Sequence, residues 1–327
     1  MKAIEVEGLV KKFGDFEAVR GISFEVEKGE IFAVLGPNGA GKSTTVHILT
    51  TILKPTGGRA FVSGFDVLRN ASEVRKRIGV VFQDPSVDRE LTGYENMYIH
   101  GRIYGLKPME LREKIEKLLK FVELWDFRDK AVKNYSGGMQ RRLEIARALL
   151  HEPEVLFLDE PTTGLDPQTR AKIWDYIQSI KEEKGMTIFL TTHYMEEAEN
   201  LADRVAIMDH GRIIAEGTPE SLKKLVGKDL IYLRLENPEK AEVLFEGLSE
   251  NYSLLLDGRI KIEVSNASEE LPKIFDLARE RNVRITEVSY HRPTLNDVFL
   301  HLTGREIRES GGNNLSLMVM RRRRMRR

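Results

Sequence analysis

The chain has 327 residues, 41% of them hydrophobic, and carries 51 lysines and arginines against 51 aspartates and glutamates. This length exceeds one typical domain, and the balanced charge gives no overall field that would attract nucleic acid, so no nucleic-acid partner is expected. The absence of cysteine excludes disulfides and thiolate metal sites and favours a reducing cytoplasm.

The first 35 residues predict three strands. Alternating apolar residues mark Ala3–Val10 and Ala18–Val26, with a turn at Gly14 and Asp15 between them. A continuous apolar run, Ile31–Leu35, follows. Such a run is typical of a buried strand.

A glycine-rich octapeptide comes next and matches the phosphate-binding pattern Gly-x-x-x-x-Gly-Lys-Ser/Thr. Its glycines let the backbone wrap closely enough for successive amides to point at phosphate oxygens at a helix N-terminus. The lysine should reach the β- and γ-phosphates, and the serine hydroxyl should be a ligand of Mg²⁺. The residues concerned are Gly36, Pro37, Asn38, Gly39, Ala40, Gly41, Lys42 and Ser43, followed by Thr44 in the predicted helix. The segment therefore predicts a nucleoside triphosphate site, although many classes of NTPase share it.

Beyond this loop, predicted strands alternate with helices. Apolar runs predict strands at 60–62, 78–83, 155–158, 187–191 and 204–208, and a helix is predicted at 168–184. From 84 to 150 the pattern is helical, with apolar residues recurring at Leu111, Ile115, Leu118, Leu119 and Val122. This order predicts an α/β fold with a mostly parallel sheet, covering helices and a helical insertion.

Two carboxylates, Asp159 and Glu160, follow the apolar run at 155–158 and would stand at a sheet edge. In a phosphate-loop enzyme, the first acid completes the Mg²⁺ shell and the second orients or deprotonates the attacking water. The pair therefore predicts hydrolysis of the bound nucleotide.

Ser136, Gly137 and Gly138 open a predicted helix at 140–150. Exposed amides at such a helix start bind anions, so the chain offers two phosphate-binding helix starts. Only a head-to-tail dimer could readily bring both to one nucleotide. The partner would be a second copy of this chain or a paralogous subunit.

These motifs, in this order, resemble the nucleotide-binding subunits of ATP-binding cassette (ABC) transporters. Residues 36–43 are similar to the Walker A loop, 155–160 to the Walker B strand and 135–139 to the signature loop. Tyr135 and Met139 replace the commoner leucine and glutamine of the signature. The resemblance implies ATP and Mg²⁺ as the bound cofactors.

The resemblance also implies roles for residues that the spacing of the motifs does not identify. Gln83 would be the Q-loop glutamine, a ligand of Mg²⁺ and water, and Asp166 would lie in a D-loop at the dimer interface. His193 would be the switch histidine on the γ-phosphate. Phe13 looks like the family's adenine-stacking aromatic, with Phe16 as the competitor.

A different pattern begins after residue 227. Strands are predicted at 230–235, 259–264 and 283–289, and helices at 239–248 and 269–281, which indicates a small α+β domain. The ending at 291–304 resembles the C-terminal domain of the daunorubicin-resistance type of exporter ATPase. Asp297 and Phe299 could also simply cap and anchor a terminal helix.

The expected fold is α/β, a P-loop NTPase of the ABC ATPase type with antiparallel β and helical subdomains, plus a small C-terminal α+β domain. We expect a nucleotide-binding domain at 1–227 with a helical subdomain at about 84–150. An accessory domain at 228–304 and a disordered arginine-rich tail at 305–327 would follow. Six of the last seven residues are arginine, so the tail could contact anionic lipid or simply be solvated.

The resemblance implies an ATP-hydrolysing exporter subunit held at the cytoplasmic face of the cell membrane by an integral-membrane permease. The alternative is a non-transport ABC ATPase that acts on the ribosome or nucleic acid, but such proteins typically carry tandem cassettes or a long coiled-coil insertion. No apolar run reaches the roughly 20 residues that span a bilayer. We therefore expect a soluble chain whose membrane role depends on its partner.

Overall fold

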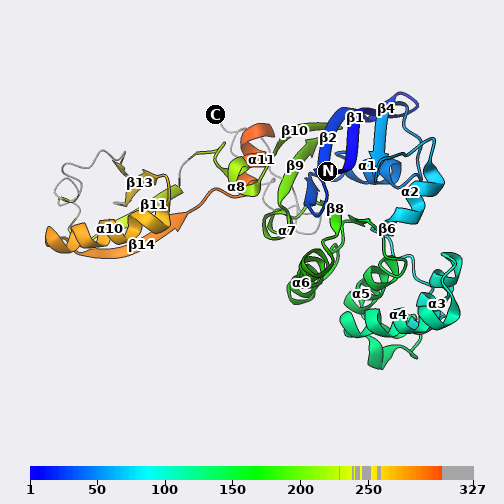
Figure 1. The fold of residues 1–327 in the computed structure, drawn as a ribbon. Helices are drawn as coiled ribbons and strands as arrows, with labels where there is room; N and C mark the ends of the chain where they lie inside the picture. The colour runs from blue at the N-terminus through cyan, green and yellow to red at the C-terminus, as the bar shows by residue number, and fades with distance from the viewer. Residues whose placement is uncertain (228, 238, 240–243, 245–251, 256–258, 304–327) are drawn as a thin grey trace, which may run out of the picture. The chain divides into compact units, whose positions relative to one another are not determined.

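Figure 1 shows the protein in a computed structural model, which describes residues 1–303 apart from 228, 238, 240–243, 245–251 and 256–258. The chain divides into two compact units, Met1–Glu216 and a second that begins at Gly217. The predicted arginine-rich tail lies outside the described residues, as does most of the helix predicted at 239–248. The division into residues 1–227 and 228–304 stays a prediction.

The first sheet of the larger unit has the strand order β2-β1-β4-β5 and is antiparallel. Its first two strands form the hairpin predicted around Gly14 and Asp15, and Phe13 pairs with Phe16 at the end of that hairpin. Two aromatic rings therefore stand at the hairpin tip. The strands are β1 (Lys2–Phe13), β2 (Phe16–Glu27), β4 (Gly57–Val62) and β5 (Phe65–Asp66).

The second sheet has six strands in the order β10-β9-β3-β8-β7-β6. Its pairs β3–β8, β3–β9, β6–β7 and β7–β8 are all parallel, which confirms the predicted parallel sheet. The strands are β3 (Ile31–Leu35), β6 (Ile78–Val81), β7 (Val155–Asp159), β8 (Thr187–Thr192), β9 (Arg204–Asp209) and β10 (Arg212–Gly217). Because parallel strands end at the same edge, the residues that follow β3, β7 and β8 come together.

Four phenylalanines form the centre of the core between the two sheets. Phe24 of the antiparallel sheet stacks on Phe32 and Phe189 of the parallel sheet, with ring centroids 5.3 Å and 5.8 Å apart. Phe157 lies 5.5 Å from Phe189 on the next strand. Every residue of β3, β7 and β8 is buried, which explains why these strands read as unbroken apolar runs rather than alternating ones.

The helices include the insertion predicted at 84–150. In Figure 1, α3, α4 and α5 form one group, and each contacts the other two. The apolar residues that predicted α4 are all buried. The bounds are α1 (Lys42–Leu49), α2 (Ala71–Arg77), α3 (Gly93–Ile103), α4 (Pro108–Phe121), α5 (Gly137–Ala148), α6 (Pro167–Lys184) and α7 (Met195–Leu201), with short 3-10 turns η1 (Trp125–Phe127) and η2 (Val132–Asn134). Among the described residues, no helix combines the length and the hydropathy that a membrane crossing needs.

The second unit is a four-stranded antiparallel sheet in the order β12-β13-β11-β14, with α10 packed on it. This confirms the predicted α+β fold, although the sequence pattern locates no strand at the residues of β12. At the start of α11, the Thr294 amide donates to Asp297 Oδ2 at 2.8 Å, and Phe299 is buried, so these two residues do cap and anchor the helix. The elements are α8 (Pro219–Lys223), β11 (Asp229–Leu235), β12 (Tyr252–Leu254), β13 (Ile260–Val264), α10 (Ala267–Glu280), β14 (Ile285–His291) and α11 (Leu295–Thr303).

Replacing Phe189 with alanine should lower the free energy of unfolding by about 3–5 kcal/mol, because the side chain is fully buried among three other rings. Urea unfolding followed by circular dichroism would measure the change. As a control, Met109→Ala on the exposed face of α4 should change stability by less than about 0.5 kcal/mol. Equal effects of the two substitutions would contradict this description of the core.

Candidate functional site

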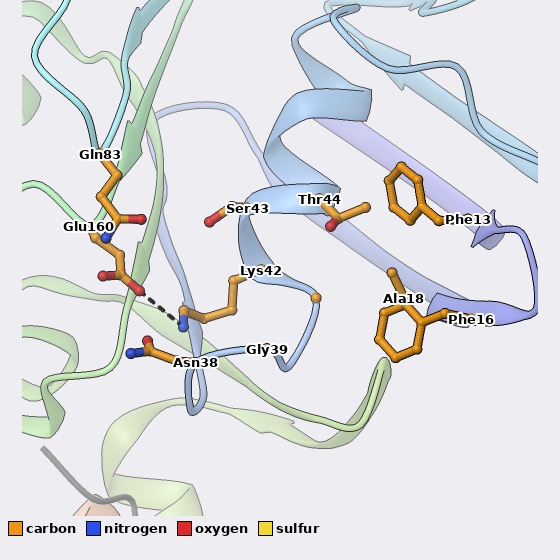
Figure 2. A pocket seen from close by; sticks show the side chains of 11 residues that line it. Phe13, Phe16, Ala18, Asn38, Gly39, Lys42, Ser43, Thr44, Gln83 and Glu160 are labelled. Carbon is orange, nitrogen blue, oxygen red and sulfur yellow. Dashed lines mark ion pairs between the residues drawn. The ribbon is translucent and has the colours of Figure 1, made fainter. Parts of the chain in front are cut away.

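A hollow of about 300 Å³ lies at the edge of the parallel sheet where β3 gives way to α1. Figure 2 shows Gln83 and Glu160 on one side of it and the two phenylalanines of the β1–β2 hairpin on the other. The hollow is lined by Phe13, Phe16, Ala18, Asn38, Gly39, Gly41, Lys42, Ser43, Thr44, Gln83 and Glu160. The structure thus brings the predicted phosphate loop, one of the two predicted carboxylates and the predicted aromatic residues to one place.

The glycines at both ends of the loop have no space for a side chain. A Cβ on Gly36 would lie 2.2 Å from the backbone oxygen of Met208. Gly41 has a φ of 106°, and a Cβ there would lie 2.5 Å from the backbone oxygen of Ala18. Close packing of the loop against β2 and β9 therefore requires glycine at these two positions.

Lys42 lies in the first turn of α1, and its ammonium group turns back beneath the loop. Its Nζ donates to the backbone oxygens of Gly36 at 2.9 Å and Pro37 at 3.2 Å. It also lies 3.1 Å from Oε1 of Glu160, the contact drawn as a dashed line in Figure 2. Both side chains are only 4% exposed, so the attraction between them is weakly screened by solvent.

Glu160 follows the end of β7 in a left-handed conformation, with a φ of 49°. Such a backbone costs a non-glycine residue about 1–3 kcal/mol unless its surroundings hold it there. Its amide donates to the backbone oxygen of Thr191 at 3.0 Å, and Thr163 Oγ1 donates to its Oε2 at 3.1 Å. The neighbouring strand therefore holds the backbone of Glu160, and the Thr163 hydroxyl fixes the direction of its carboxylate.

His193 follows the end of β8, and its Nδ1 lies 3.2 Å from Oε2 of Glu160, although without the angle of a hydrogen bond. Burial raises the pKa of the Glu160 carboxyl. The neighbouring His193 and Lys42 outweigh that effect and lower the pKa from its usual value near 4.5 to about 2. Glu160 is therefore ionised throughout the neutral range.

Asp159 is the last residue of β7 and is buried beside the phosphate loop. Ser43 Oγ donates to its Oδ1 at 3.1 Å, and the hydroxyl of Thr191 donates to the same oxygen. A hydroxyl and a carboxylate are hard oxygen donors of the kind that Mg²⁺ prefers. The described residues contain no cluster of three or more His, Asp or Glu side chains able to hold a metal. Ser43 and Asp159 supply two such donors, and this set fits an ion that is held partly by its substrate and by water.

Gln83 lies two residues beyond the end of β6, which stops at Val81 rather than at Gln83 as predicted. Its backbone oxygen accepts from Arg141 Nη2 at 3.1 Å, and the same guanidinium donates to the oxygen of Phe82 at 2.6 Å. Arg141 is buried on α5 beside Glu144, whose Oε1 accepts from the Ser86 amide at 2.6 Å. Sequence reasoning missed this pair, because charged residues in a helix usually face solvent.

Two rings from the β1–β2 hairpin line the hollow. Phe13 is 48% exposed and Phe16 is 61% exposed, which is unusual for side chains of this size. The ammonium of Lys11 lies 4.9 Å from the centroid of the Phe13 ring, so one face of that ring already carries a cation. Both rings are thus placed where a base could stack.

The second predicted anion site lies in a separate hollow of about 240 Å³, lined by Ser136, Gly138, Met139, Arg142, Gln168, Thr169, Lys172 and Ile173. Ser136 caps α5 by accepting from the Met139 amide at 3.2 Å. Gly137 lies against Leu165, and a Cβ on Gly138 would lie 2.3 Å from Cγ2 of Thr169. Asp166 caps α6 through the Thr169 amide at 3.0 Å and lies in neither hollow.

Two family models match this chain. One, described as ABC transporter, matches residues 19–163. The other, described as the C-terminal domain of ATP-binding proteins like DrrA1-3, matches residues 217–303.

Known proteins match nearly the whole chain. The daunorubicin resistance ATP-binding protein DrrA3 of Streptomyces coeruleorubidus is 44% identical over 94% of this chain and 98% of its own length. The Nod factor export ATP-binding protein I of Sinorhizobium fredii is 41% identical over 94% of this chain and 88% of its own length. A solved dimeric post-hydrolysis structure of an ATP-binding cassette bound to ADP and Pi is 28% identical, with a TM-score of 0.60 over 66% of this chain and 98% of that one.

The low pKa of Glu160 predicts a specific pH dependence of stability. Because the folded-state pKa is below the usual value, the carboxylate stabilises the fold at neutral pH, and this contribution is lost as the pH falls from about 4.5 to about 2. Glu160→Gln should therefore lose less stability than the wild type over that interval in urea unfolding. The control Glu196→Gln, at an exposed position, should lose as much stability over this pH interval as the wild type. An equal loss of stability in Glu160→Gln would contradict the prediction.

Proposed function

This chain belongs to the ABC transporter family and is an ATPase of that family, and we propose that its ATP hydrolysis drives export through a separate integral-membrane permease. One observation supports the catalytic part most strongly. Lys42, Glu160 and His193 come from three different segments of the chain and meet at the edge where β3, β7 and β8 end. This is the edge at which a parallel sheet places its ligands.

The phosphate loop and Lys42 would bind the triphosphate. Backbone amides of the loop would surround the phosphates at the start of α1, where the helix dipole adds partial positive charge. The ammonium of Lys42 already lies beneath the loop, held by two backbone oxygens and by Glu160. A γ-phosphate would compete with Glu160 for this cation and would leave the carboxylate free to face water.

Glu160 would then act on the attacking water. A carboxylate held by Thr163 and the β8 strand needs no reorganisation when the reaction begins. His193, whose Nδ1 lies 3.2 Å from the same carboxylate, would contact the transferring phosphoryl group. Ser43, Asp159 and Gln83 would hold Mg²⁺, which neutralises charge on the β- and γ-phosphate oxygens when it is bound.

The site would be completed by a second ATPase subunit. Ser136 and Gly138 line a different hollow from Lys42 within the one chain, so they would act on a nucleotide held by the partner. The dimeric ADP- and Pi-bound relative supports this arrangement. Asp166, exposed at the start of α6, would lie at the interface.

The helical group α3–α5 would transmit the state of the site to the permease. The backbone after Gln83 is bound by Arg141 and Glu144 of α5. The Asp88 amide then donates to Asn96 Oδ1 of α3 at 2.9 Å, so this segment is tied to α3 as well. Ile99, Ile103 and Met109 leave exposed apolar surface on the same group, and we place the permease contact there. The protein would thus work at the cytoplasmic face of the membrane.

The exporter assignment rests on the relatives, and the identity of the cargo does not follow from it. Two relatives of almost equal identity are named for daunorubicin resistance and for Nod factor export. Similar ATPases are therefore named for different cargoes, so the choice of cargo would reside in the permease. An ATPase acting on the ribosome or on nucleic acid is not favoured by these relatives.

Glu160→Gln should bind ATP normally but hydrolyse it on the order of 100- to 10,000-fold more slowly, because it lacks the base while keeping the shape of the side chain. Steady-state phosphate release measures the rate, and size-exclusion chromatography with ATP should show a trapped dimer. Glu182→Gln on the exposed face of α6 is the control. Wild-type turnover in the Glu160→Gln variant would refute the assignment of Glu160.

Phe13→Ala should weaken ATP binding by about tenfold or more, because base stacking on an aromatic ring contributes about 1–3 kcal/mol. Isothermal titration calorimetry in a Glu160→Gln background would measure the Kd without turnover. Phe16→Ala is the matched comparison and should have the smaller effect, because only the Phe13 ring is held by Lys11. The opposite order would transfer the stacking role to Phe16.

A further inference from the structure

Helix α7 carries a fully buried carboxylate that the proposed chemistry does not use. Glu197 lies four residues beyond His193 and is 0% exposed. A buried acid is costly unless it is hydrogen-bonded, so its partners indicate what it does. The carboxyl lies where α7 meets α6 and the segment that follows Glu160.

One oxygen of Glu197 connects three parts of the chain. Its Oε1 accepts from Thr162 Oγ1 at 2.8 Å and from Trp174 Nε1 at 3.0 Å. Thr162 is itself fully buried and lies two residues after Glu160, and Trp174 is on α6. The carboxyl therefore fastens α7 both to the catalytic segment and to α6.

This attachment matters because α7 has little stability of its own. The helix spans seven residues, and its N-cap residue Tyr194 makes no side-chain capping bond. A helix this short depends on tertiary contacts. His193 directly precedes Tyr194, and their rings lie 4.2 Å apart. The direction of the histidine is thus set by how α7 is held.

Helix α6 also contacts, at a second point, the segment that holds His193. The guanidinium of Arg170 lies 4.0 Å from the centroid of the Tyr194 ring. At its start, α6 packs against the signature loop, where Thr169 leaves no space for a Cβ on Gly138. Helix α6 therefore contacts both the signature loop, which would act on the partner's nucleotide, and the segment that holds His193.

We propose that Glu197 is a positioning residue for His193, joining the switch histidine and the Glu160 segment to α6, the helix that also packs against the signature loop. The inference rests on the proposed ATPase mechanism, since it assigns how the His193–Glu160 contact is kept in place. It needs no direct contact between Glu197 and the nucleotide. A shift of His193 by about 1 Å is enough to cost on the order of a hundredfold in rate.

The decisive comparison is between Glu197→Gln and Glu197→Met. Glutamine keeps an oxygen acceptor for Thr162 and Trp174, and because burial raises the pKa of Glu197, a neutral group suits this site. Methionine fills the space but accepts no hydrogen bond. In the full-length protein, we expect Glu197→Met to lower kcat on the order of ten- to a hundredfold, with KM for ATP within about twofold of wild type. Glu197→Gln should retain most of kcat.

A spectroscopic readout separates positioning from a general loss of stability. The chain has two tryptophans, so Trp125→Phe leaves Trp174 as the sole reporter beside Glu197. In this background the emission of Trp174 should change when ATP is added to the Glu160→Gln protein. Glu197→Met should abolish that change, and Glu197→Gln should preserve it. Glu196→Met, on the exposed side of the same helix, is the matched control and should behave as wild type.

Three results would overturn the inference. The first is wild-type kcat in a folded Glu197→Met protein. The second is a parallel loss of kcat, ATP binding and thermal stability in both Glu197 variants, which indicates only a structural role. If Glu197→Met does not fold, Thr162→Val can be used instead, because it removes one hydrogen-bond donor to Glu197 at nearly constant volume. Wild-type kcat in Thr162→Val is the third result that would overturn the inference. Absence of ATP hydrolysis by the wild-type protein would instead refute the proposed function, whatever the Glu197 variants show.

Discussion

The site depends on one constraint, the common ending of three parallel strands at the same edge of a sheet. β3 delivers the phosphate loop, β7 delivers Asp159 and Glu160, and β8 is followed by His193. Parallel pairing sets the register of all three strands, so residues from separate parts of the chain arrive within contact distance. The phenylalanine core between the two sheets holds this edge, because the aromatic rings of Phe24 and Phe189 fix one sheet against the other.

Lys42 and Glu160 are both buried and neutralise each other, so neither carries the full cost of an isolated buried ion. The triphosphate of ATP would bring negative charge to the same cation. Binding would therefore change the partner of Lys42 and, through it, the surroundings of Glu160. Glu160, the proposed catalytic carboxylate, and Lys42, the proposed phosphate-binding cation, are thus linked before any reaction begins.

Under the proposed function, the described chain would offer two half-sites rather than one complete site. Lys42 and Ser136 line different hollows, which gives a physical reason for the dimer that the family uses. Helix α6 contacts elements of both half-sites, through Thr169 at its start and Trp174 in its middle. Because a packed helix moves as one body, α6 would couple a movement at one half-site to the other.

The sequence alone determined the fold class and the phosphate loop, because the spacing of Gly36, Lys42 and Ser43 and the unbroken apolar strands follow from local backbone chemistry. It also gave the order of motifs that carries the family resemblance. Only the tertiary structure decided that Lys42 meets Glu160, that Arg141 is buried, and that Glu197 joins α7 to α6. From the sequence alone, a charged residue in a helix is predicted to face solvent. Its burial becomes known only with the elements packed around it, because burial depends on contacts between distant segments rather than on local sequence.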